Sequence, residues 1–191
     1  RVVLGQVKTE DKSNEITAIP ELLDVLALKG CIVTIDAMGC QKNIAAGVID
    51  KGADYVLALK GNQGTLHEDI KLFFQDANDT SFKDIRHDFH ETIDGDHGRI
   101  ETRRYWTVSD IDWLAGKADW KELKSIGMVE SEREIGDKLT RETRYYISSL
   151  PGNAKLFGDA VRKHWGVENS LHWVLDVVFR EDECRIRNGY A

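Results

Sequence analysis

Apolar and amphipathic stretches alternate over the first 80 residues of the chain. The runs CIVTI and DYVLALK are apolar and rich in β-branched residues, which is typical of strands covered on both faces. Other stretches carry apolar residues at helical spacing and end on glycine or begin with a capping residue. The pattern predicts strands at 2–7, 31–35 and 54–60 and helices at 17–30, 41–52 and 65–77. This order predicts a parallel sheet flanked by helices.

The pattern changes between residues 81 and 150. Segments such as IETRRYWTV, KSIGMVESERE and TRETRYYISSL alternate in polarity or are rich in aromatic and β-branched residues. We therefore expect an inserted, mainly β lobe at 81–150, between a first core part at 1–80 and a helical part at 151–191. Asn153 is expected to cap a long helix in the last part.

One stripe of that last helix is unusual. Val161, Trp165, Glu168, His172 and Leu175 recur at helical spacing, so a carboxylate interrupts a stripe that otherwise faces the core. A buried carboxylate is costly unless a cation or an arginine compensates it. Glu168 is therefore either a salt-bridge partner or a metal ligand.

Asp36 presents a similar choice at the end of the strand CIVTI. Sites in open α/β sheets lie beyond the carboxyl ends of the strands, and Asp36 stands there, followed by Ala, Met and Gly. It is either an ordinary turn residue or a metal ligand.

Composition places the chain among globular proteins. Its 191 residues are 41% hydrophobic and 31% charged, with a net charge of −7. The negative net charge argues against a nucleic-acid partner. The arginines gather in the later part of the chain, however, so a local basic groove is compatible with this net charge. Three cysteines without metal-ligand spacing indicate reduced thiols.

Basic and aromatic residues interleave in two of the predicted strands. RRYW begins at Arg103 and Arg104, and RYY begins at Arg144. The pattern suits phosphate contacts and stacking on a base. Arginines lying along an ordinary strand pair explain it equally well.

Several separated blocks together resemble the DDE transposases of the H-repeat-associated type, found in bacterial insertion sequences and beside Rhs elements. These blocks are TIDAMGCQKNIA, DYVLALKGNQGTLHEDI, HGRIETRRY, RYYISSL and VRKHWGVENSLHWVLDVVFREDECRIR. The resemblance implies a ribonuclease-H-like mixed sheet flanked by helices. It also implies that Asp36 and Glu168 (in HWGVEN) are catalytic carboxylates that hold two Mg²⁺ ions, with Mn²⁺ as a substitute.

The implied activity is cleavage and strand transfer of double-stranded DNA, at transposon ends and at a target, by an oligomer. The expected location is the bacterial cytoplasm, at the nucleoid when DNA is bound, with no membrane association. The expected DNA contacts are Arg103, Arg104, Arg144, Arg162, Lys163 and Trp165. Arg162 and Lys163 are expected to substitute for basic residues that related families carry where this chain has His164 and Leu175.

The family's first catalytic Asp has no counterpart in this sequence, because its strand would precede residues 2–7. We therefore expect the chain to be a fragment that binds metal weakly and does not cut DNA. Two alternatives remain open. One is a non-catalytic, transposase-derived relic that binds DNA. The other is a nucleotide-binding module using the turn KGNQGT (60–65), although that turn lacks the spacing of a P-loop.

Overall fold

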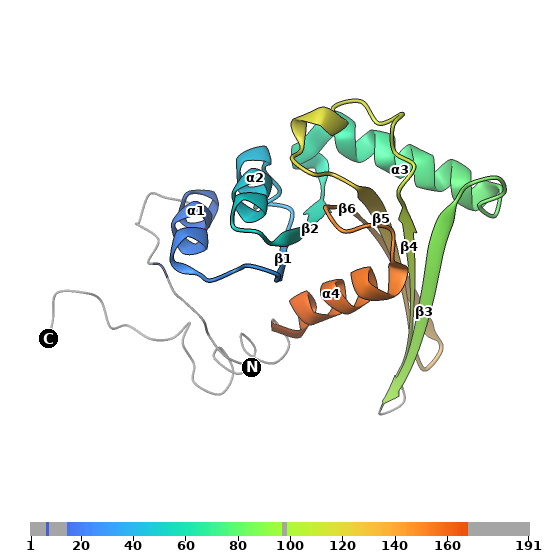
Figure 1. The fold of residues 1–191 in the computed structure, drawn as a ribbon. Helices are drawn as coiled ribbons and strands as arrows, with labels where there is room; N and C mark the ends of the chain where they lie inside the picture. Colours follow the sequence, from blue (N-terminus) through green and yellow to red (C-terminus); the bar gives the residue numbers. More distant parts are fainter. Residues whose placement is uncertain (1–6, 8–14, 97–98, 168–191) are drawn as a thin grey trace, which may run out of the picture.

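The computed structural model describes residue 7, residues 15–96 and residues 99–167 (Figure 1). Its strands are β1 (Ile32–Ile35), β2 (Asp54–Leu59), β3 (His87–Asp96), β4 (Arg99–Val108), β5 (Ser125–Ile135) and β6 (Lys138–Ser148). Its helices are α1 (Glu15–Val25), α2 (Lys42–Asp50), α3 (Gly64–Asp79) and α4 (Ala154–Val167), with short 3₁₀ turns η1 (Gly61–Gln63) and η2 (Lys117–Asp119). Within these ranges no helix is both long and apolar enough to cross a membrane.

All six strands form one mixed sheet in the order β1-β2-β6-β5-β4-β3. β1 and β2 are parallel, and every other neighbouring pair is antiparallel. Helices cover both faces of this sheet, so the predicted mixed sheet flanked by helices is confirmed. The strand predicted at 2–7 falls outside the described residues except for residue 7, which has no regular structure.

The α/β elements of the first part follow the hydrophobic pattern closely. β1, α2, β2 and α3 lie where the sequence predicts them. Helix α1 begins at Glu15, before the expected cap Thr17, so Pro20 lies inside the helix and not in its first turn. Asn153 caps α4 as predicted, because its side-chain oxygen accepts a hydrogen bond from the Leu156 N–H at 2.8 Å.

The segment 81–150 is mainly β, as expected, but its strands do not form a sheet of their own. β6 hydrogen-bonds along β2, from Val56 opposite Ser148 to Leu59 opposite Tyr145, and therefore extends the core sheet. The physical reason is that β2 would otherwise offer an unpaired edge, which β6 fills. The division of the chain at residues 80 and 150 stays a prediction.

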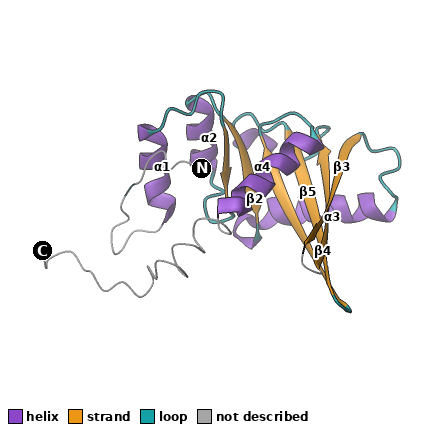
Figure 2. Cartoon of the chain, turned by 90° about the horizontal axis from the view of Figure 1, so that it is seen from below, coloured by secondary structure: helices purple, strands orange, loops and turns teal. Residues whose placement is uncertain are grey.

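One face of the sheet carries the larger hydrophobic core. Helices α1, α2 and α3 pack there against β2, β5 and β6, around buried side chains such as Phe74, Tyr55 and Ile147. Figure 2 shows α3 behind the sheet and α4 crossing in front of it. The opposite face is therefore left to α4.

Two glycines allow α4 to lie close to its face of the sheet. A Cβ on Gly127 of β5 would come within 2.6 Å of the Phe157 ring of α4. A Cβ on Gly158 of α4 would come within 3.0 Å of the Tyr105 ring of β4. The N-terminus of the helix is held as well, since the Ala154 N–H donates to Asp88 of β3 at 2.8 Å.

The long strands β3 to β6 project beyond α4. Both views show their far end as a ribbon that no described helix covers (Figures 1 and 2). The exposed face of this ribbon and the side of α4 meet at an angle. Five of the described arginines from the later part of the chain gather at that junction.

We predict that Gly127→Ala destabilises the protein by about 1–3 kcal/mol, because the new methyl group would overlap the Phe157 ring and push α4 away. Urea unfolding measures the change. Gly95→Ala is the matched control, also in a strand, where nothing lies within 4 Å of the new Cβ. Equal stability losses in the two variants would contradict the proposed close packing of α4.

Candidate functional site

Asp36 lies directly after β1, at the carboxyl edge of the parallel pair β1 and β2. Its side chain is exposed, and its Oδ1 atom accepts a hydrogen bond from the Met38 N–H at 3.0 Å. This bond fixes the carboxylate at the start of the loop without burying it. Asp36 is thus a turn residue whose carboxylate remains accessible.

The loop after Asp36 is held by the turn after β2. Asn62 donates its side-chain amide to the Ala37 carbonyl, and Gln63 donates to the Cys40 carbonyl, both at 2.6 Å. The amides of the turn KGNQGT therefore brace the Asp36 loop. Burial raises the pKa of the Cys40 thiol to about 12, so this thiol stays protonated at neutral pH and is not a thiolate ligand.

The end of α4 reaches the strand that carries Asp36. His164 Nδ1 and Thr34 Oγ1 are 3.2 Å apart, linking α4 to β1. Thr34 lies on β1, and Asp36 directly follows the last residue of that strand. Glu168 lies outside the described residues, so its distance from Asp36 stays a prediction.

Asp36 is a hard oxygen donor of the kind that Mg²⁺ prefers. In the part of the chain that the structure describes, no three His, Cys, Asp or Glu side chains come together to hold a metal ion. Asp36 therefore has the chemistry of a metal ligand, and its role as one stays a prediction.

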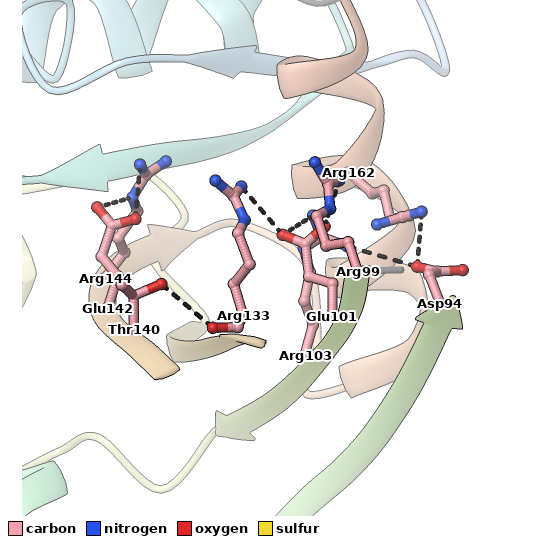
Figure 3. Close-up of polar contacts among 9 residues, drawn as sticks. All are labelled: Asp94, Arg99, Glu101, Arg103, Arg133, Thr140, Glu142, Arg144 and Arg162. Atoms are coloured by element: carbon pink, nitrogen blue, oxygen red, sulfur yellow. Dashed lines mark hydrogen bonds and ion pairs between the residues drawn. The ribbon is translucent and has the colours of Figure 1, made fainter. Parts of the chain in front are cut away.

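A groove of about 780 Å³ opens between α4 and the ribbon of β3 to β6. Arginines from four different elements line it, and Figure 3 shows their side chains gathered around carboxylates. The charged residues of this arginine groove are Arg99, Arg103, Arg133, Arg144, Arg162, Asp94, Glu101 and Glu142. Five guanidinium groups thus face three carboxylates, which makes the groove locally basic in an acidic chain.

Glu101 lies at the centre of the arginine groove, with only 5% of its side chain exposed. Its carboxylate contacts Arg99 at 2.9 Å, Arg103 at 2.5 Å and Arg133 at 3.4 Å. A buried carboxylate among three guanidinium groups fixes their positions, since leaving it unpaired would be costly.

Arg144 and Trp165 form the wall of the groove nearest to β1. The Arg144 guanidinium lies 4.0 Å from the centre of the Trp165 ring, a cation–π contact. Burial tends to lower the Arg144 pKa, but hydrogen bonding and attraction to Glu142 outweigh it, and the pKa is raised overall. The guanidinium is therefore charged at any physiological pH and lies over the indole.

Four of the six residues predicted to contact DNA lie together in the arginine groove: Arg103, Arg144, Arg162 and Trp165. Arg104 does not, because adjacent strand residues point to opposite faces. It forms ion pairs with Glu91 at 2.8 Å and Glu130 at 3.0 Å on the other face. Lys163 is exposed on α4 and is not among the residues that line the groove.

Sequence reasoning missed Arg99, Glu101 and Arg133 as members of the site. Their signal is the alternation of charged residues along β4 and β5, in which Arg99, Glu101 and Arg103 share one face. The register between β4 and β5 brings Arg133 opposite Glu101, and the sequence alone does not give that register.

The chain matches the family model described as "Transposase DDE domain" over residues 1–190. It therefore belongs to the DDE transposase family, which confirms the resemblance seen in its motifs.

Curated relatives in bacteria agree with this assignment. The chain is 50% identical to "Putative transposase YncI" of Escherichia coli O157:H7, over all of this chain and 49% of that protein. It is 45% identical to "H repeat-associated putative transposase YhhI" of Escherichia coli K12, over all of this chain and 51% of that protein. The chain thus spans about half the length of these relatives.

We predict that Glu101→Gln lowers the free energy of unfolding by about 3 kcal/mol, because three guanidinium groups lose a buried counter-ion. Glu142→Gln removes the same charge from an exposed pair, and we expect a loss of at most about 1 kcal/mol. Urea unfolding of both variants measures the difference. Similar small losses would mean that Glu101 does not organise the groove.

Proposed function

We infer that this chain supplies part of the catalytic domain of a DDE transposase, which cleaves DNA phosphodiester bonds and transfers the strands. Asp36 and Glu168 are the proposed metal ligands. The observation that carries the proposal is the hydrogen bond between His164 and Thr34. It joins the end of α4, four residues before Glu168, to the strand that ends at Asp36.

Helical spacing supports the same arrangement. Residues four apart lie on one side of a helix, separated by about one turn. If α4 continues for one more residue in the same geometry, Glu168 follows His164 on the side that faces β1. The proposed site would then combine one carboxylate from a strand end and one from a helix, on two elements packed together.

Two Mg²⁺ ions held by these carboxylates would activate a water or 3′-hydroxyl nucleophile and stabilise the leaving oxygen. The protein's own contribution is to bind and orient the DNA. The arginine groove supports this role, since it lies beside α4 and offers guanidinium groups and an indole to the phosphate backbone and the bases. We propose that an upstream segment of the whole protein provides the third carboxylate.

We predict that this chain alone does not cut transposon-end DNA, because the proposed metal site lacks one anionic ligand. A longer protein that includes the sequence encoded upstream of Arg1 should cut it with Mg²⁺ or Mn²⁺. In that protein, Asp36→Asn and Glu168→Gln should each slow cleavage at least about a hundredfold, since metal stabilisation of the transition state is worth several kcal/mol.

Asp24→Asn is the control for these two variants, because Asp24 is an exposed residue of α1 that pairs with Lys51. Gel analysis of labelled DNA measures the rates. An inactive longer protein would favour the non-catalytic relic. Cleavage by this chain alone, abolished by Asp36→Asn, would refute the missing third ligand.

A further inference from the structure

Every arginine of the arginine groove already has an acidic partner. Glu101 binds Arg99, Arg103 and Arg133. Asp94 of β3 binds Arg162 of α4 at 2.7 Å and Arg103 at 3.4 Å. Glu142 and Arg144 of β6 form a two-pronged pair with contacts of 2.7 and 3.0 Å. A phosphate that enters the groove therefore has to compete with carboxylates of the protein.

These carboxylates differ strongly in exposure. Only 5% of the Glu101 side chain is exposed, compared with 50% for Asp94 and 56% for Glu142. Exposed ion pairs contribute little to stability, so they can be exchanged at small cost. A buried carboxylate shared by three arginines cannot leave without exposing several unpaired charges to a poorly solvated site.

Guanidinium groups bind carboxylates and phosphates through the same forked geometry. The Glu142 carboxylate occupies the fork of Arg144 as a phosphate would, while the Trp165 ring holds that guanidinium from another side. Asp94 bridges arginines from two elements, β4 and α4, as one phosphate can. Figure 3 shows Asp94 and Glu142 at opposite ends of the group, with Glu101 between them.

We propose that Asp94 and Glu142 are exchangeable stand-ins for phosphate, and that the phosphodiester backbone of DNA displaces them from Arg103, Arg162 and Arg144. Glu101 stays in place as the permanent counter-ion that aligns Arg99, Arg103 and Arg133. The identification of the ligand as DNA rests on the proposed function. The exchange itself rests on the ion pairs and their exposure.

The carboxylates of Asp94 and Glu142 weaken the binding of DNA to the arginine groove. The two exposed acids lower the affinity of the groove for any single anion, so only a ligand that presents several phosphates at once displaces both. It also reduces the dependence of binding on salt, because the free protein neutralises its arginines internally and draws fewer ions from solution.

The test measures DNA binding by this chain with a fluorescently labelled duplex in about 150 mM salt, where charges more than about 8 Å apart are screened. EDTA excludes divalent ions. We predict that Asp94→Asn combined with Glu142→Gln tightens binding roughly three- to tenfold and steepens the salt dependence, since both competing acids are gone. Thermal unfolding checks that each variant is folded.

The opposite face of the same ribbon provides matched controls. Glu132→Gln removes one negative charge, as Glu142→Gln does, from a partly buried carboxylate that contacts Arg141 at 2.7 Å and Arg104 at 4.0 Å. It should leave affinity within about twofold, because Glu132 does not line the groove. Arg162→Ala should weaken binding, whereas Arg141→Ala, which also breaks a 2.7 Å pair, should not.

Equal tightening by Glu132→Gln and Glu142→Gln would overturn the proposal, because net charge alone would then explain the effect. Unchanged or weaker binding by the Asp94 and Glu142 double variant would overturn it too, as would the absence of DNA binding in every variant. The cleavage assay of the longer protein decides the catalytic function separately. A protein that cleaves DNA but shows no such tightening keeps its proposed function and loses this mechanism.

Discussion

The close packing of α4 on the sheet determines both parts of the site. Gly127 and Gly158 let the helix approach until the rings of Phe157 and Tyr105 fill the contact. From that position the first N–H group of α4, that of Ala154, donates a hydrogen bond to Asp88, and the other end of the helix meets β1 through His164. A helix displaced by the width of one methyl group would disturb both the wall of the arginine groove and the approach toward Asp36.

Strand alternation places neighbouring charged residues on opposite faces of the sheet. Arg103 and Arg104 are neighbours in sequence, yet one lies in the arginine groove and the other pairs with glutamates on the opposite face. The ribbon thus carries arginines toward α4 and an acidic stripe of Glu130 and Glu132 on its other side. A chain with a net charge of −7 can hold a basic groove because five arginines face three carboxylates there, while Glu91, Glu130 and Glu132 lie on the opposite face.

The sequence predicted the elements whose apolar spacing is regular, such as β1, α2, β2 and α3. It missed β3 because HDFHETIDGD is polar and poor in strand-forming residues, and its partner β4 determines its conformation. The position of Asp36 after β1 could be predicted because the apolar run of the strand ends there in the sequence. The role of Asn62 and Gln63 could not, because their hydrogen bonds cross between two loops that only the parallel pairing of β1 and β2 brings together. The groove around Glu101 could not be predicted either, because it depends on the register between β4 and β5.

The central claim is that α4 carries Glu168 to the strand end at Asp36. The most direct measurement is a crystal structure of the longer protein, which includes its upstream segment. The crystals are soaked in Mn²⁺, and anomalous scattering locates the bound ions. We expect Mn²⁺ bound by the carboxylates of Asp36 and Glu168, with paired ions about 4 Å apart. Carboxylates of Asp36 and Glu168 more than about 10 Å apart, or Mn²⁺ bound elsewhere with neither residue as a ligand, would contradict the account.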